Sequence, residues 1–195
     1  KKTPANLMGI EVCQDLFPGT PNVAVFDTQF GMSMPPESYM YGLPYEYYED
    51  LHIRRYGFHG TSHTYVSKKT AEFLHKPLSE TNCIVMHLGN GSSLSCTKNG
   101  KCLDTSMGLT PLEGMIMGTR CGTLDPAIVP FIMKKKGFTP EEMDTLMNKK
   151  SGLQALCGSA DMRDVHKERE NGNKRAELAF RMLVHGIKKI LGSYF

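Results

Sequence analysis

The chain has 195 residues, of which 40% are hydrophobic and 22% are charged, a composition that is typical of a folded globular protein and excludes a disordered or fibrous one. The formal net charge of +3 comes without a long basic run, and no stretch is apolar for long enough to cross a membrane, so we expect neither a nucleic-acid nor a membrane partner. Six cysteines without a C-x-x-C pair predict neither a zinc site nor a disulfide framework, which fits reduced thiols in the cytoplasm.

The N-terminal segment is predicted to contain a helix followed by a buried strand. Pro4 favours the first turn of a helix, and the helical pattern ends before Pro18. The apolar run over residues 23–26 is typical of a buried strand, and Asp27 follows it directly. An aspartate at the exposed end of such a strand is where α/β proteins often place a catalytic or metal-binding carboxylate. The alternative for Asp27 is a helix cap or a turn.

Two histidines surround the start of the next predicted helix. Residues 53–58 form a basic, strand-like piece, and we expect Thr61 or Ser62 to cap the helix that follows. His59 therefore stands before the positive end of a helix, where it can donate to an anion. His59 and His63 are four residues apart, but the glycine between them and the absence of an intervening glutamate argue against a zinc site.

The centre of the chain is predicted to be a three-stranded meander with a glycine loop at its first turn. The apolar run Cys83–Leu88 and the alternating run after Ser92 predict two strands, and Asn99-Gly100 predicts the hairpin to a third. Because Gly89 and Gly91 lack a Cβ, backbone N–H groups of the loop could approach and bind a phosphate. A lone motif of this kind is more often an ordinary strand connection.

One arginine and a series of helices follow the meander. Arg120 is embedded among glycines and small polar residues, which favours a carboxylate or phosphate partner over a structural salt bridge. One helix is predicted to end at Gly137, a capping box at Thr139 opens the next, and a last amphipathic helix covers residues 173–191. Residues 158–164 are predicted to be a polar loop. The order of elements indicates an α/β or mixed α+β fold.

Six short motifs occur in order along the chain: Val-Phe-Asp-Thr (25–28), Leu-Pro-Tyr-Glu-Tyr-Tyr (43–48), Arg-Tyr-Gly-Phe-His-Gly-Thr-Ser-His (55–63), His-Leu-Gly-Asn-Gly (87–91), Asp-Thr-Ser-Met-Gly (104–108) and Met-Gly-Thr-Arg (117–120). Any one of them would be weak evidence. Together they make almost the whole chain resemble the acetokinase family of acetate and propionate kinases. The resemblance implies an α/β, actin-like ATPase fold built on ribonuclease-H-like sheets. It also implies that residues 1–30 end the first domain and its hinge, and that residues 31–195 are the first part of the second domain with its phosphate loop.

The resemblance assigns roles to three groups of residues. Asp27 is expected to hold Mg²⁺ directly or indirectly, while a histidine and an arginine stabilise the transition state. The catalytic group consists of Asp27, His59 and Arg120. The nucleotide-binding group consists of His87, Leu88, Gly89, Asn90, Gly91, Asp161, Met162 and Arg163. The acetate-binding group consists of Phe58, Pro111 and Arg120.

The activity that the resemblance implies is reversible phosphoryl transfer from ATP to acetate, giving acetyl phosphate and ADP by direct in-line attack. It further implies Mg²⁺ or Mn²⁺ as cofactor, a homodimer, a cytoplasmic location and a part in acetyl-CoA biosynthesis. Three alternatives remain: a propionate kinase, a relative that uses the same motifs with pyrophosphate, and a catalytically incomplete nucleotide-binding fragment. The chain lacks the family's N-terminal Asn-Cys-Gly-Ser-Ser loop and its C-terminal adenosine loop. We therefore expect an internal fragment that is inactive in isolation.

Overall fold

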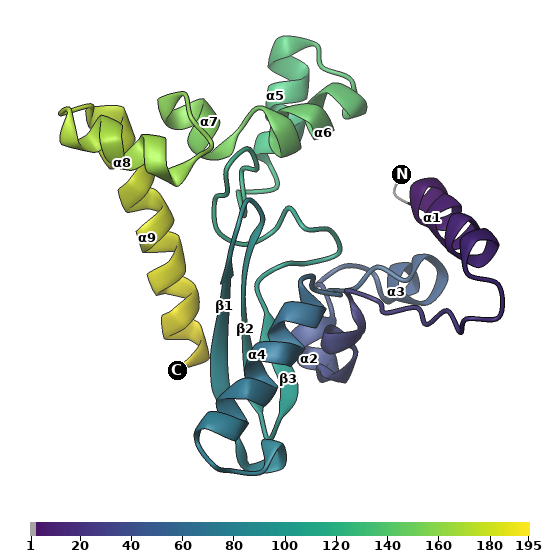
Figure 1. Ribbon diagram of the computed structural model, residues 1–195. Helices are drawn as coiled ribbons and strands as arrows, with labels where there is room; N and C mark the ends of the chain where they lie inside the picture. The colour runs from purple at the N-terminus through teal and green to yellow at the C-terminus, as the bar shows by residue number, and fades with distance from the viewer. Residues whose placement is uncertain (1–2) are drawn as a thin grey trace.

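A computed structural model describes residues 3–195, and its central element is an antiparallel sheet of three strands (Figure 1). β1 (Cys83–Leu88), β2 (Ser92–Lys98) and β3 (Lys101–Thr105) follow one another in the order β1-β2-β3. Asn99 and Gly100 both have positive φ, at 53° and 73°, as a tight hairpin between β2 and β3 requires. The predicted meander is therefore confirmed.

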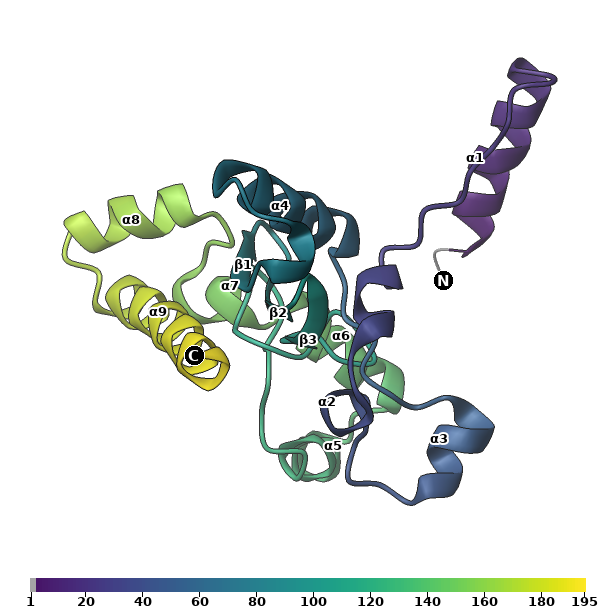
Figure 2. The same cartoon turned by 90° about the horizontal axis from the view of Figure 1, so that it is seen from below.

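The sheet lies between two helices (Figures 1 and 2). α4 (Gly60–Phe73) packs on β1 and on the 3-10 helix η1 (Gln29–Ser33), while α9 (Lys174–Tyr194) contacts β2. The predicted C-terminal helix is thus confirmed and is slightly longer than expected.

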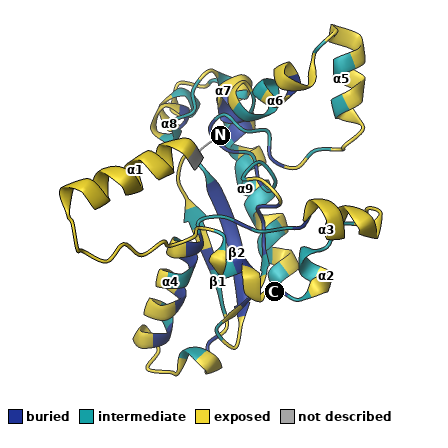
Figure 3. Ribbon diagram, turned by 90° about the vertical axis from the view of Figure 1, so that its right-hand side faces the viewer, coloured by how far each residue is buried: buried dark blue, intermediate teal, exposed yellow. Residues whose placement is uncertain are grey.

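β2 is the centre of the core. Successive side chains of a strand point to opposite faces of the sheet. Ser93 and Ser95 face α4, where both contact His63, and Leu94 faces the opposite side, where it is fully buried. Every residue of β2 from Ser92 to Thr97 is buried, which makes β2 the darkest strand of Figure 3. The face toward α4 is therefore a buried surface of hydroxyl groups.

Shorter elements surround this layered centre. Their bounds are α1 (Thr3–Leu16), α2 (Pro36–Tyr39), α3 (Tyr45–Leu51), η2 (Leu78–Glu80), α5 (Ile128–Lys136), α6 (Pro140–Lys149), α7 (Gly152–Cys157) and α8 (Met162–Glu170). The capping box at Thr139 and the stop at Gly137, with φ 68°, are confirmed. None of the described helices combines the length and the apolar character that crossing a membrane requires.

The predicted strand at residues 23–26 is wrong. α1 forms as expected, but it stands away from the sheet, and the segment after it is irregular (Figures 1 and 3). Val25 and Phe26 are 70% and 67% exposed. A strand exists only when a neighbouring strand pairs with its backbone, and in the described part of the chain no strand lies beside this segment.

Two further predictions are corrected. Residues 53–58 form a loop, because the N–H groups of Tyr56 and Gly57 donate to the carbonyl of Gly108 rather than to a strand partner. Gly57 has φ +73°, which an extended strand would not contain. Within the predicted loop 158–164, α8 already begins at Met162, because the Asp161 side chain accepts from the N–H of Arg163 and caps the helix.

Candidate active site

Asp27 lies where the N-terminal segment meets the start of α4. The N–H of His59 donates to Asp27 Oδ2 at 2.8 Å, and the N–H of Gly60 donates to the backbone carbonyl of Asp27 at 2.9 Å. A Cβ at position 60 would lie 2.2 Å from that carbonyl oxygen, so only glycine allows this approach. Asp27 is exposed, and its carboxylate is therefore oriented by the helix start while it remains open to solvent.

The cap of α4 differs from the predicted one. His59 is the N-cap residue, with φ 59° in the left-handed region, and its side chain makes no capping hydrogen bond. The predicted caps, Thr61 and Ser62, both lie inside the helix. Ser62 instead contacts Nδ1 of His87 at 2.9 Å. The predicted position of His59 at the positive end of the helix is confirmed.

Two histidines stack at the centre of the site. The rings of His59 and His87 lie with their centroids 3.9 Å apart and their planes 21° from parallel. Burial lowers the pKa of His59, the nearby His87 and Arg120 lower it further, and Asp27 opposes them. The net effect favours the neutral form of the His59 imidazole. Its Nδ1 contacts Ser93 Oγ at 2.9 Å, which leaves Nε2 for a ligand.

The glycine loop brings Arg120 and His59 together. A methyl group at Gly91 would lie 3.1 Å from Nη1 of Arg120 and 3.2 Å from Nε2 of His59. Nη1 of Arg120 also donates to the carbonyl of Pro111 at 3.1 Å. None of the salt bridges among the described residues involves Arg120, so its charge is available for an anion. The charged guanidinium of Arg120 and the imidazole of His59 thus both lie close to Gly91, which has no side chain to block a ligand.

The segment that carries Arg120 is held by the start of α7. The N–H of Leu153 donates to Met117 and that of Gln154 donates to Gly118, at 3.0 and 2.9 Å. Gly152, with φ +64°, allows this approach, because a Cβ there would lie 2.1 Å from the carbonyl oxygen of Met117. The backbone on which Arg120 stands is therefore fixed by a neighbouring helix.

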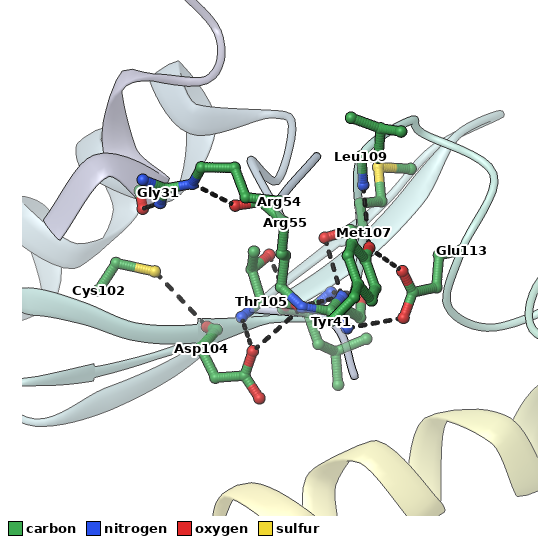
Figure 4. A network of polar contacts seen from close by, with 12 residues as sticks. Gly31, Tyr41, Arg54, Arg55, Cys102, Asp104, Thr105, Met107, Leu109 and Glu113 are labelled. Atoms are coloured by element: carbon green, nitrogen blue, oxygen red, sulfur yellow. Dashed lines mark hydrogen bonds and ion pairs between the residues drawn. The ribbon is translucent and has the colours of Figure 1, made fainter. Parts of the chain in front are cut away.

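A polar network that the sequence did not reveal supports the same region (Figure 4). Nη1 of Arg55 donates to the carbonyls of Thr105 and Met107, both at 3.1 Å, and Nη2 of Arg55 pairs with Glu113 Oε1 at 2.7 Å. The hydroxyl of Tyr41 donates to Glu113 Oε2 at 2.6 Å, and burial together with this bond raises the pKa of Tyr41 to about 12. The network holds in place the segment that leads to Pro111. No local spacing connects its members, so sequence patterns carried no signal for it.

The remaining predicted site residues divide into two groups. Pro111 lies beside Arg120, and Phe58 is half-buried and directly precedes His59. Asp161 and Arg163 lie at the start of α8, where they pair with each other, and this pairing lowers the pKa of Asp161 to about 2. α8 begins at the same end of the sheet as the glycine loop (Figures 1 and 3). None of the hydrogen bonds or ion pairs of residues 3–195 joins Asp161 or Arg163 to the histidines.

Asp27 is the candidate ligand for a metal ion at this site. Within residues 3–195, no group of three or more His, Cys, Asp or Glu side chains is arranged to hold one. Mg²⁺ in phosphoryl-transfer sites commonly uses only one or two carboxylates and fills its shell with water and substrate phosphates. The exposed carboxylate of Asp27, oriented by the start of α4, fits that requirement.

The chain is similar to known proteins in both sequence and fold. The sequence matches the model of the acetokinase family over residues 2–195. The chain is 73% identical over 192 residues to an acetate kinase of Desulfovibrio desulfuricans, covering 98% of this chain and 48% of that protein. The fold matches the crystal structure of Porphyromonas gingivalis acetate kinase with a TM-score of 0.95 at 46% identity, over 98% of this chain and 48% of the other.

A propionate kinase from Francisella tularensis matches almost equally well, with a TM-score of 0.94 at 46% identity, over 98% of this chain and 49% of the other. The chain thus spans about half the length of the relatives it matches. These solved relatives have the actin-like ATPase fold that the motifs implied, and the mixed α and β structure described above is about half of it. On its motifs, its fold and its match over nearly every residue, the chain belongs to the acetokinase family.

Proposed function

We propose that the full-length protein containing this chain is an acetate kinase, which transfers the γ-phosphoryl group of ATP to acetate and releases acetyl phosphate and ADP. The observation that carries the proposal is the convergence of Arg120 and His59 on Gly91, with Asp27 held beside His59. A phosphoryl group at the loop would meet a permanent cation and an imidazole in one site. The 73% identical relative is itself named acetate kinase.

The reaction suits a site without a general base. A carboxylate is already ionised at neutral pH, so its oxygen can attack phosphorus in line with the departing ADP without losing a proton. Catalysis then requires alignment and neutralisation of charge on the three equatorial oxygens. Arg120 supplies the charge, and Nε2 of His59 supplies a hydrogen bond. Gly91 leaves the space in which these oxygens would lie.

The cofactor and the binding contacts belong to the same proposal. Mg²⁺ or Mn²⁺ would enter with the nucleotide, held by Asp27 directly or through water, and would neutralise the phosphates. We assign His87, Leu88, Gly89, Asn90 and Gly91 to the phosphates, and Asp161, Met162 and Arg163 to the nucleotide. The common end of the sheet at which both segments lie supports this assignment (Figure 1). Phe58 and Pro111 would contact the acetate methyl group.

The test is ATP formation from acetyl phosphate and Mg-ADP by the full-length protein. His59→Ala and Arg120→Ala should each lower kcat by about 10² to 10³, the loss expected when one transition-state donor is removed. The matched controls are His166→Ala and Arg181→Ala, exposed residues of α8 and α9, which should retain activity. Near-normal turnover in either site variant would refute its assigned role.

A propionate kinase is the second candidate, favoured by the Francisella tularensis structure. One methylene group changes binding in an apolar pocket by only about 1 to 3 kcal/mol, so we expect the enzyme to use both substrates with different kcat/KM. The ratio of kcat/KM for acetyl and propionyl phosphate decides between them. Activity with neither, together with retained binding of ADP, would favour a nucleotide-binding fragment or a pyrophosphate-dependent relative.

We also propose a cytoplasmic homodimer that takes part in acetyl-CoA biosynthesis, in which residues 1–30 end the first domain and residues 31–195 begin the second. Support for the domain division is that α1 and residues 23–26 are largely exposed (Figure 3) and that α1 stands away from the sheet (Figure 1). Light scattering of the full-length protein tests the dimer. Limited proteolysis tests the division, because the exposed segment 18–26 should be cut before the sheet is degraded.

A further inference from the structure

A chain of hydrogen bonds runs from the buried core to the proposed catalytic histidine. Ser95 Oγ lies 2.8 Å from Nδ1 of His63, Nε2 of His63 lies 2.7 Å from Ser93 Oγ, and Ser93 Oγ lies 2.9 Å from Nδ1 of His59. We call these four residues the histidine–serine chain. Ser93, Ser95 and His63 are completely buried, so water does not compete for their hydrogen bonds. Each of the three contacts therefore requires one proton from within the chain.

The protonation state of His63 restricts the directions in which the hydrogen bonds of this chain can run. Burial and the neighbouring histidines lower the pKa of His63 to about 4, so it is neutral at neutral pH and donates from only one ring nitrogen. The ring is also held in place by Phe30, which stacks on it with centroids 5.6 Å apart. Because Ser93 has a single hydroxyl proton, it can donate to one histidine only and must accept from at least one.

When His59 is neutral, two proton arrangements satisfy all three bonds and also use the Ser93 proton. A third, in which Ser93 accepts from both histidines, would leave its buried hydroxyl proton without a partner. In the first, Ser95 donates to His63, Nε2–H of His63 donates to Ser93, and Ser93 donates to Nδ1 of His59. His59 then carries its own proton on Nε2. In the second arrangement every proton is reversed, and Nε2 of His59 is a bare acceptor that would repel a phosphate oxygen.

We propose that the histidine–serine chain adopts the first arrangement, so that Ser93 and His63 are positioning residues that hold His59 as the neutral Nε2–H tautomer facing Gly91. This inference rests on the proposed function, because the transferring phosphoryl group requires a donor at Nε2. The stacking of His59 on His87 limits the tilt of the ring, and the Ser93 hydroxyl fixes its rotation. The site thereby presents the Nε2–H of His59 to the substrate.

The direct test is ¹⁵N NMR of the full-length protein labelled at histidine, with His59→Gln used to assign the resonances. The expected wild-type spectrum shows His59 protonated on Nε2 and bare on Nδ1 at neutral pH. In Ser93→Ala, His59 should populate both tautomers. A wild-type His59 protonated on Nδ1, or a spectrum that Ser93→Ala leaves unchanged, would overturn the proposal. The spectrum is independent of turnover, so it remains decisive even if acetyl phosphate is not the substrate.

Kinetics of paired variants separate positioning from a structural role. Ser93→Ala should lower kcat by about 10- to 100-fold, the usual cost of removing the group that orients a functional histidine, while KM for acetyl phosphate stays near wild type. Ser67→Ala is the matched control, because Ser67 is a buried serine of α4 that lies outside the histidine–serine chain and contacts Cys83. It should keep kcat close to wild type.

His63 provides a conservative rescue. In His63→Gln the side-chain amide nitrogen occupies about the position of Nε2 and can still donate to Ser93, whereas His63→Leu cannot donate. We expect activity and the His59 tautomer to be retained in His63→Gln and lost in His63→Leu. Equal loss of kcat in the Ser93→Ala and Ser67→Ala variants, or in both His63 variants, would contradict a positioning role and indicate a general packing defect.

Discussion

Gly60→Ala isolates the contact that orients Asp27. The new Cβ would lie 2.2 Å from the Asp27 carbonyl oxygen and 3.1 Å from Phe30 Cβ. This is about 1 Å short of ordinary van der Waals contact, and the obstacle is backbone, which cannot rotate away. Asp27 and the N–H groups of His59 and Gly60 must therefore separate. A 1 Å misplacement of catalytic groups costs about 10²-fold in rate, and we expect a loss of that size in kcat.

Helix propensity would increase the stability of α4 in this variant. Alanine stabilises a helix by about 0.5 to 1 kcal/mol relative to glycine, so a lower rate would not come from a weaker α4. The assay is ATP formation from acetyl phosphate and Mg-ADP by the full-length protein, with the apparent Tm measured in parallel. Gly42→Ala is the matched control, because a Cβ there meets nothing within 4 Å. Turnover of Gly60→Ala close to wild type would refute the reasoning that this approach positions Asp27.

Three further predictions concern stability of the full-length protein. The pKa of His63 is lowered to about 4, so the unfolded chain binds more protons below pH 6.5, and up to about 3 kcal/mol of stability present above that pH is lost as the pH falls toward 4. His63→Gln should flatten the dependence of apparent Tm on pH in this window, and an unchanged slope would contradict the assignment. Leu94→Ala, at a fully buried position, should cost about 3 to 5 kcal/mol in urea unfolding, and Leu103→Ala, at a 40% exposed position, clearly less. Thr139→Ala removes the capping box of α6 and should cost about 1 kcal/mol, whereas no measurable change would show that the box is dispensable.

Local patterns predicted much of the sheet and several helix ends. The alternation around the glycine loop and the turn at Asn99 specify a meander, because side chains alternate along a strand and a tight hairpin needs positive φ. The box at Thr139 and the stop at Gly137 depend only on residues within one turn of the helix. The ordered motifs identified the family, and with it the three residues Asp27, His59 and Arg120.

Partners distant in sequence account for what these patterns missed. The run at residues 23–26 has the composition of a buried strand, but pairing requires a neighbour that the described residues do not provide. His59 replaces the predicted caps of α4 because Asp27, 32 residues earlier, accepts its N–H. In the same way, Glu113 and Arg55 are paired across 58 residues.

The sequence by itself therefore determined the family, the local strand and helix signals and the identity of the chemical groups, since these depend on residue type and short spacing. The tertiary structure alone decided how the groups meet. It stacked His59 on His87, brought Gly91 against Arg120, and connected His59 through Ser93 to a neutral, buried His63. The physical reason is that hydrogen-bond direction and burial depend on which side chains from distant segments pack together, and no local pattern encodes that.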